Sequence, residues 1–489
     1  MSARKRSSGE VPTNLPGPAQ SLATAYKTLD PRPLLDRVAL EAFYRDSVTQ
    51  FRGMDCVQRM RLGLERAWTA QRYKAFLMGH SGVGKSTELT RLLGLPLVES
   101  RFRSIRLSVV EDLDPVGFKP FDVLLVMMHE VVRRTAEPCA EGGAGKPPAD
   151  RLLQRVLDWF AQERRLVERR TEVGAEAKAG AGLDGDSVWA KMLGIFASVR
   201  GEMKYASTRK TEVVEYRLSQ LSSLIDAANA LMDECNRLQV AADGREWLFV
   251  IEDFDKAGVA RRATEDFFIT YANVIRGLRC HLVFTLPIAL GYSSKEAQLP
   301  LPQQQKFCIP DTMVFHRDLS PHDEARAALR TVLEARVAPN LFAPGQLDRL
   351  IVASGGNLRD LFSMTSSACD RALLDSRDRV EASDVDQAIR ELTTTYERRL
   401  GDSPFDDELS PEGRGVAYED KVRLMLRIYR GEEEAKVPNA VLYALLRSRA
   451  VQEFNGERWF GLHPVVVDIL AKQGHLPRRP NGDYLGGTL

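Results

Sequence analysis

The sequence predicts an α/β protein whose core is a doubly wound parallel sheet, followed by an all-helical region and a small C-terminal domain. Two observations lead to this prediction. Between residues 74 and 286, short apolar runs typical of buried strands alternate with segments of helical periodicity. From residue 320 to about residue 400, the spacing of apolar residues is helical throughout.

Length and composition limit the classes of protein to which the chain can belong. Its 489 residues are enough for about two to four domains. The formal net charge is +1, so no overall basic field points to nucleic acid, and such a contact would need a local patch. No apolar run reaches the length of about 18 residues that predicts a membrane span. Six widely spaced cysteines without a C-x-x-C pair favour a reducing, cytoplasmic location over disulfides or a zinc site.

Each expected element has its own pattern. Strands are expected at residues 74–79, 104–110, 247–251 and 281–286. Helices are expected at residues 86–95, 122–136, 150–170 and 188–238, and further along at 321–336, 345–353, 358–375 and 383–399. Near the C-terminus, Asn455-Gly456 between two strand-like runs predicts a hairpin with a type I′ turn.

A glycine-rich loop joins the first expected strand to the helix after it. Gly79-His80-Ser81-Gly82-Val83-Gly84-Lys85-Ser86 matches the pattern G-x-x-x-x-G-K-[ST] in full, and Thr87 follows. Glycines allow positive φ and let backbone N–H groups approach phosphate oxygens, while Lys85 places a cation on the β- and γ-phosphates. The Ser86 hydroxyl is expected to bind Mg²⁺, and the helix directs its positive end at the anion. The loop therefore predicts that residues 79–87 bind ATP with Mg²⁺.

Two carboxylates follow the third expected strand. Glu252 and Asp253 come directly after the apolar run 247–251, at the carboxyl edge of the sheet, where α/β proteins bind ligands. ATP hydrolysis needs one carboxylate near Mg²⁺ and often a second that activates the attacking water. We favour Glu252 in the metal shell and Asp253 as the group that orients the water, and the reverse assignment stays open. Asp255 and Lys256 are expected to form a local pair or an interface element.

Two further residues are candidates for contacting the γ-phosphate or the attacking water. Thr285 lies near the end of the fourth expected strand, beside the acidic one. Arg359 follows Asn357, which can cap the next helix, so it lies in the first helical turn, where the helix dipole disfavours a cation. A nucleotide phosphate would explain an arginine at this position. A surface salt bridge is the alternative.

These motifs resemble those of AAA+ ATPases, in the branch near the origin-recognition initiators and the STAND regulatory ATPases. GHSGVGKST resembles the Walker A motif of that family, LFVIEDFDK its Walker B motif, FTLP its sensor-1 strand and GGNLRDLF its sensor-2 helix. The resemblance implies ATP hydrolysis. The residues implied for catalysis are Lys85, Glu252, Asp253, Thr285 and Arg359.

The resemblance also has implications outside the nucleotide site. GHSGVGKSTELTRL and the terminal LLRSRAVQEFNGERWFGLHP resemble stand-alone bacterial ATPases of defence gene clusters, in which the ATPase is thought to sense or gate a neighbouring effector. The terminal segment resembles a winged helix with Asn455-Gly456 at the wing tip. Arg276 and Arg279 match the place where initiator-type ATPases present an arginine in trans, although a helix C-terminus also favours cations there.

The domain organisation follows from these assignments. The expected parts are a disordered tail (1–30), a P-loop ATPase core (31–319) with a mostly helical insertion (137–240), a helical lid (320–400), a linker (401–415), a winged-helix-like domain (416–475) and a C-terminal tail (476–489). The insertion is expected either to pack on the core or to contact an oligomer partner or an effector. In the winged-helix-like domain, Arg447, Arg449 and Arg458 give only a thin basic bias, so protein contact or autoinhibition weighs as much as DNA binding.

Three functions are compatible with the sequence. The favoured one is an ATP-dependent molecular switch that forms a homo-oligomer and regulates a separately encoded effector, in bacterial anti-phage defence. No nuclease, protease or deaminase motif accompanies the loop, so destructive chemistry would belong to the partner. The alternative is a DNA-acting ATPase of the initiator or transposition-regulator type, against which the near-neutral charge counts. A nucleotide-binding module with little turnover is the third, and Glu252 and Asp253 argue against it.

Overall fold

The computed structural model describes residues 17–67, 72–159, 211–256, 258–401, 415–455 and 459–477. The chain divides into two compact units. The lid unit comprises Met1–Val57, Gly79–Gly94 and Ile309–Leu489, and the sheet unit comprises Gln58–Met78 and Leu95–Cys308. Among the described residues, no helix has both the length and the apolar character needed to cross a membrane.

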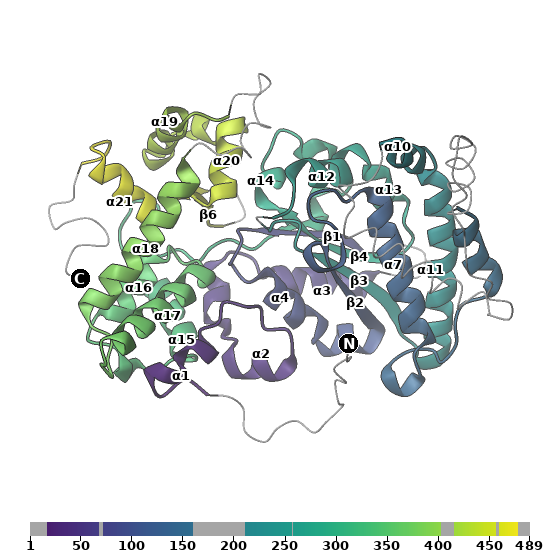
Figure 1. Cartoon of the computed structure of the whole chain (residues 1–489), viewed down its shortest axis with the longest axis horizontal. Helices are drawn as coiled ribbons and strands as arrows, with labels where there is room; N and C mark the ends of the chain where they lie inside the picture. The colour runs from purple at the N-terminus through teal and green to yellow at the C-terminus, as the bar shows by residue number, and fades with distance from the viewer. Residues whose placement is uncertain are drawn as a thin grey trace, which may run out of the picture. The chain divides into compact units, whose positions relative to one another are not determined.

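The sheet unit contains the predicted parallel sheet (Figure 1). Its strands are β1 (Lys74–Gly79), β2 (Phe102–Ser108), β3 (Glu246–Glu252), β4 (His281–Pro287) and β5 (Lys306–Cys308), in the spatial order β2-β3-β4-β1-β5. The pairs β2–β3, β3–β4 and β1–β5 are parallel. This confirms the α/β class and all four expected strands. The fifth strand was not expected, because three residues are too short for a recognisable pattern.

Helices cover the sheet because its strands are apolar on both faces, as in other parallel sheets. The remaining elements of this unit are α3 (Cys56–Arg66, which starts in the lid unit), α5 (Pro96–Arg101), α6 (Val109–Asp112), α7 (Pro120–Ala136), η2 (Cys139–Glu141), α10 (Thr211–Ser219), α11 (Leu221–Asp243), α12 (Arg261–Glu265), the π-helical turn η4 (Asp266–Thr270), α13 (Ala272–Gly277), α14 (Ile288–Gly291), η5 (Glu296–Gln298) and η6 (Gln303–Gln305). In the core, the rings of Phe254, Phe267, Phe268 and Phe284 pack edge-to-face or stacked at 4.8–6.2 Å between centroids.

The described part of the insertion packs on this core. Helix α11 lies beside α7 (Figure 1), and its buried face includes Leu224, Ala228 and Leu231. A helix that covers a core needs one apolar face, and α11 has one. For α11, the expectation that the insertion packs on the core is therefore confirmed. Residues 160–210 of the insertion lie outside the described residues.

The lid unit is almost entirely helical, as predicted for residues 320–400. Its elements are α1 (Leu22–Thr28), α2 (Arg37–Phe43), η1 (Asp46–Phe51), α4 (Lys85–Leu93), α15 (Asp323–Glu334), η7 (Pro339–Leu341), α16 (Gln346–Ala353), α17 (Leu358–Leu374), α18 (Ala382–Leu400), α19 (Tyr418–Tyr429), η9 (Glu433–Lys436), α20 (Ala440–Ser448), β6 (Val451–Glu453), β7 (Phe460–Leu462) and α21 (Pro464–Lys472). Helices α16, α17 and α18 pack against one another (Figure 1).

One local prediction in this unit is wrong, and a second is confirmed in part. The expected disordered tail of residues 1–30 contains helix α1, which buries Leu22 and Ala25 and packs against α17. The hairpin of β6 and β7 forms as expected, and the Phe454 N–H donates to the Trp459 carbonyl at 3.1 Å. The type I′ turn stays a prediction, because residues 456–458 lie outside the described residues.

Candidate functional site

The phosphate loop, residues 79–86, leaves β1 and enters α4 in the lid unit. Gly82 and Gly84 have φ of +97° and +104°, a left-handed conformation that disfavours any other residue. At Gly82 a Cβ atom would also lie 2.4 Å from Asn357 Oδ1. Helix α4 starts at Lys85, so its N-terminus adjoins the loop, as anion binding requires.

The side chains of the loop have defined partners. Lys85 is buried, and its Nζ donates to the carbonyls of Gly79 at 2.9 Å and His80 at 3.0 Å. Its ammonium group thus lies over the loop backbone, from where it can transfer to phosphate oxygens. Thr87 Oγ1 accepts a hydrogen bond from the Leu34 N–H at 3.2 Å, which ties the loop helix to the N-terminal segment. The role of Ser86 as a Mg²⁺ ligand stays a prediction.

The start of helix α17 lies directly on the phosphate loop. Asn357 caps the helix as predicted, with Oδ1 accepting from the Asp360 N–H at 3.4 Å, and its Nδ2 donates to the Ser81 carbonyl at 3.1 Å. Arg359 Nη1 donates to Ser81 Oγ at 2.5 Å, and its backbone N–H donates to the Gly82 carbonyl at 3.2 Å. The structure therefore brings Arg359 to the loop that is expected to hold the phosphates.

Sequence reasoning missed a second arginine at this loop. Arg449 Nη1 donates to the Ser81 carbonyl and to Asn357 Oδ1, both at 3.1 Å, and Nη2 pairs with Asp360 Oδ1 at 3.0 Å. The side chain is buried. Burial alone would lower the pKa of Arg449, but Tyr396 and Asp360 raise it above its ordinary value. Arg449 was only a candidate DNA contact, with protein contact or autoinhibition weighed equally, and here its guanidinium group is enclosed among these partners.

The C-terminal hairpin also reaches the loop. The Glu453 N–H donates to His80 Nε2 at 3.2 Å. In the same unit, His463 caps helix α21: its Nδ1 accepts from the Val465 N–H at 3.3 Å. The other ring nitrogen of His463, Nε2, lies 3.0 Å from the Ser354 carbonyl oxygen. Burial lowers the pKa of His463 to about 4. Lid helices and the C-terminal helices thus share one polar network around the phosphate loop.

In the sheet unit, polar side chains gather at the carboxyl ends of β2, β3 and β4. Ser108 pairs in register with Glu252, and the pairing of Ile251 with Phe284 places Thr285 opposite Glu252 on the other side. The three residues therefore form a row across neighbouring strands. This is the edge at which the sequence predicted catalysis.

The two acids have different environments. Glu252 is buried, and Oε2 accepts from Arg106 Nε at 2.9 Å. Asp253 has φ of +75°, which is rare for a residue other than glycine, and Oδ2 accepts from Ser108 Oγ at 2.7 Å. Lys256 Nζ lies 3.5 Å from Asp253 Oδ1.

Two oxygens in this row are buried and have no hydrogen-bond partner within the described part of the chain: Glu252 Oε1 and Thr285 Oγ1. Leaving a buried polar atom unpaired costs about 1–3 kcal/mol, so such atoms in a native site call for an explanation. A hydrated Mg²⁺ and an attacking water would supply the missing partners. The residues present therefore fit the metal and water that ATP hydrolysis uses.

The candidate trans-acting arginines lie at the end of α13 and beyond it. Arg279 forms an ion pair with Asp233 at 2.7 Å, and its backbone N–H donates to Asn229 Oδ1 at 2.7 Å. Its side chain is 59 % exposed, so it is accessible to another molecule. The trans-acting role of Arg276 or Arg279 stays a prediction.

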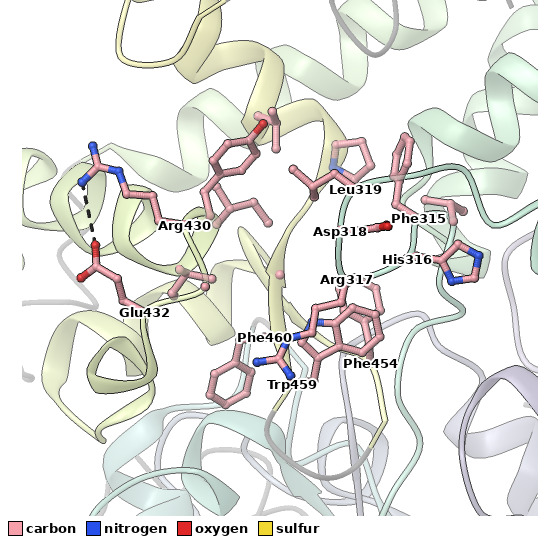
Figure 2. A pocket seen from close by; sticks show the side chains of 18 of the residues that line it. Phe315, His316, Arg317, Asp318, Leu319, Arg430, Glu432, Phe454, Trp459 and Phe460 are labelled. Atoms are coloured by element: carbon pink, nitrogen blue, oxygen red, sulfur yellow. Dashed lines mark ion pairs between the residues drawn. The ribbon is translucent and has the colours of Figure 1, made fainter.

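A cavity of about 360 Å³ lies in the lid unit between residues 314–319 and the C-terminal helices and hairpin (Figure 2). Phe454, Trp459 and Phe460 line one part of it, and Arg430 and Glu432 pair at its rim at 3.9 Å. The described lining residues do not include the phosphate loop. This cavity is therefore separate from the nucleotide site.

The sheet order and the loop after β1 define the class of the fold, a doubly wound α/β fold of the P-loop type. No protein-family model and no curated protein matches the chain. The chain is similar to a solved structure of Cdc6p from Pyrobaculum aerophilum, with 12% identity, a TM-score of 0.37, and coverage of 93% of this chain and 92% of that chain. It is similar to the ORC2 protein of Aeropyrum pernix with 13% identity, a TM-score of 0.38, and coverage of 92% of this chain and 98% of that chain. It is also similar to the RuvB Holliday junction branch migration motor of Thermotoga maritima (9%, 92% and 100%, 0.32).

Proposed function

We propose that this chain is an ATPase of the AAA+ initiator type that binds and hydrolyses Mg-ATP. The observation on which this proposal rests is the phosphate loop, with its left-handed glycines, its buried Lys85 and a helix starting at its end. These are the features that anion binding by a backbone loop requires. The unpaired oxygens of Glu252 and Thr285 support hydrolysis as well as binding.

Each residue has a proposed role in this reaction. Lys85 binds the β- and γ-phosphates, and the hydroxyl of Ser86 and the carboxylate of Glu252 hold the metal shell. Bound Mg²⁺ neutralises negative charge on the phosphate oxygens. Asp253 orients the attacking water and accepts its proton, while the hydroxyl of Ser108 holds that carboxylate in place.

Arg359 has the sensing role. Its guanidinium group donates to Ser81 Oγ, and a γ-phosphate bound by the same loop would be a stronger acceptor, because it is charged. Thr285 is proposed to contact the same phosphate or the attacking water. Only ATP would then make these γ-phosphate contacts, so ATP and ADP would bind the two states of the lid with different affinity. Such a difference is the requirement for a nucleotide-controlled switch.

We further propose that this switch controls assembly of a homo-oligomer and the activity of a separately encoded effector. The chain carries no second catalytic motif, so an output has to lie in a partner. The insertion at residues 137–240 and the unit at residues 416–475 supply none of the proposed catalytic residues and are candidate docking surfaces. A place in bacterial anti-phage defence rests on the sequence resemblance alone.

The alternative is an ATPase that acts on DNA. The succession of helices, hairpin and helix from α19 to α21 is compatible with the winged helix that the sequence resembles, and related domains bind DNA. Burial of Arg449 removes one of its three candidate DNA contacts. DNA binding would therefore depend on Arg447, on Arg458, which lies outside the described residues, or on another surface.

One set of measurements tests these proposals. Phosphate release from ATP is measured for the full chain with and without Mg²⁺, and particle mass is measured with ADP and with a non-hydrolysable ATP analogue. We expect Mg²⁺-dependent release and a larger particle with the analogue. A monomer in every nucleotide state without a co-purifying protein would exclude the switch. Tight, salt-sensitive binding of duplex DNA by that monomer would select the alternative.

A further inference from the structure

Three consecutive carbonyl groups of the phosphate loop accept hydrogen bonds from residues outside the loop. The Ser81 carbonyl accepts from Asn357 Nδ2 and Arg449 Nη1, both at 3.1 Å. The Gly82 carbonyl accepts from the Arg359 N–H at 3.2 Å, and the Val83 carbonyl accepts from Arg52 Nη1 at 3.2 Å. All of these residues belong to the lid unit.

Peptide geometry gives these contacts a consequence for anion binding. In a planar trans peptide, the carbonyl of one residue and the N–H of the next point in opposite directions. Donors on the carbonyls of Ser81 and Val83 therefore direct the N–H groups of Gly82 and Gly84 to the side opposite the donors. Backbone N–H groups of such a loop are the groups that surround phosphate. The intervening Val83 N–H closes a turn onto the His80 carbonyl at 3.3 Å.

Arg449 occupies its position at a conformational and electrostatic cost. It follows α20 with φ of +65°, and its buried charge needs the paired carboxylate of Asp360. That carboxylate is itself held by Tyr396, whose hydroxyl donates to Asp360 Oδ2 at 2.9 Å. If the cluster only filled space, apolar residues of similar volume would give equal or higher stability than a buried ion pair. Costs of this kind concentrate at functional sites.

We propose that Arg449 is a positioning residue of the phosphate site, supplied by the C-terminal unit (residues 416–475). Together with Asn357, it holds the Ser81 carbonyl so that the Gly82 N–H faces the phosphates. Docking of the C-terminal unit is thereby coupled to nucleotide binding. This inference rests on the proposed ATP binding. It adds the contact, from Arg449 to the phosphate loop, through which nucleotide binding would affect the C-terminal unit.

The coupling is reciprocal. If the docked C-terminal unit improves phosphate binding, bound phosphate must stabilise docking by the same factor. Nucleotide would then slow hydrogen exchange in α20 and β6, although neither element contains a predicted nucleotide ligand. A purely structural Arg449 would change stability without this nucleotide dependence.

The test uses the full chain. The double variant Arg449→Met/Asp360→Asn removes both charges of this ion pair, so that neither partner is left as an unpaired buried charge. Arg449→Lys keeps the charge but loses the two-pronged geometry. Arg423→Met is the matched control, because Arg423 is an exposed arginine of the same unit whose partner is Asp420. Binding of ADP and of a non-hydrolysable ATP analogue is measured by calorimetry, and hydrogen exchange of residues 440–454 is measured with and without nucleotide.

We expect the double variant to bind both nucleotides about 10-fold more weakly and to lose nucleotide-dependent protection of residues 440–454. Arg449→Lys should give an intermediate affinity, and Arg423→Met should match the unmodified chain. If the double variant does not fold, the lysine variant gives the same comparison. Unchanged affinity would make Arg449 purely structural, and tighter binding would make the C-terminal unit a competitor of nucleotide. Absence of binding by the unmodified chain would instead refute the proposed ATPase.

Discussion

Acid should weaken the packing around His463, and the structure gives the size of the effect. The imidazole is fully buried against Tyr396, with ring centroids 4.3 Å apart. Because Nδ1 accepts from the Val465 N–H, the proton is on Nε2 and is donated to the Ser354 carbonyl. The folded unit therefore requires the neutral ring. Burial lowers its pKa from 6.5 to about 4.

The sign of the pH effect follows from which state takes up the proton. Between pH 6.5 and 4 the unfolded chain protonates His463 and the folded chain does not, so stability is fully present above pH 6.5 and falls as the pH falls towards 4. Each pKa unit corresponds to about 1.4 kcal/mol, which gives a total of about 3 kcal/mol. At pH 5 about 2 kcal/mol of this should already be lost. Arg449 is the nearby cation that further disfavours a charged ring, whereas Asp360 and Asp311 favour it.

The assay compares variants at two pH values, so that titration of other groups cancels. Urea unfolding of the lid unit, followed by a probe on α21, is measured at pH 7.5 and pH 5.0 for the full chain, for His463→Asn and for His475→Asn. Asparagine can still cap α21 but does not titrate. We expect the loss of stability between the two pH values to be about 2 kcal/mol smaller in His463→Asn. His475 is exposed, so the His475→Asn variant should lose as much stability as the unmodified chain. If His463→Asn also loses as much as the unmodified chain, the reasoning is refuted.

The remaining predictions concern the nucleotide site. Lys85→Ala should abolish tight ATP binding, because it removes the cation at the β- and γ-phosphates, and unchanged affinity in calorimetry would contradict the site. Asp253→Asn should bind ATP but release phosphate at least ~10²-fold more slowly, and normal turnover would reverse the roles of the two acids. Glu252→Gln should weaken the Mg²⁺ dependence of that release, measured by metal titration. Arg359→Ala should keep the fold but lose the change in proteolysis pattern with ATP; a pattern that still changes would place the sensor elsewhere.

Local patterns predicted the parts of the site that depend on neighbouring residues. The phosphate loop needs glycines, a lysine and a flanking strand and helix, all within residues 74–93, and the structure confirms this succession of strand, loop and helix. The same holds for Asn357, whose capping role depends on the next three residues. The four strands of six or seven residues were recognised. The short β5 was not.

Contacts between distant residues were not predictable in this way. Arg449 reaches Ser81 across 368 positions, and no periodicity marks an arginine after a helix as a phosphate-loop contact. Arg106 is different, because it lies near the carboxyl end of β2, the strand next to the acidic β3. Its pairing with Glu252 could have been inferred once the strand order was known.

The polar character of the network around the phosphate loop suits a reversible contact. Burial disfavours the charged form of Asp311 and so raises the pKa of its carboxyl group. Hydrogen bonds from Gln452 and Asn357 to this carboxyl group act in the opposite direction. A contact made of such groups gains little net free energy on forming, because the same groups are well solvated when they separate. An apolar interface of equal size would hold the C-terminal unit permanently. A nucleotide that contributes about 3 kcal/mol to one arrangement would shift a balanced contact roughly 150-fold, which is the range in which a switch operates.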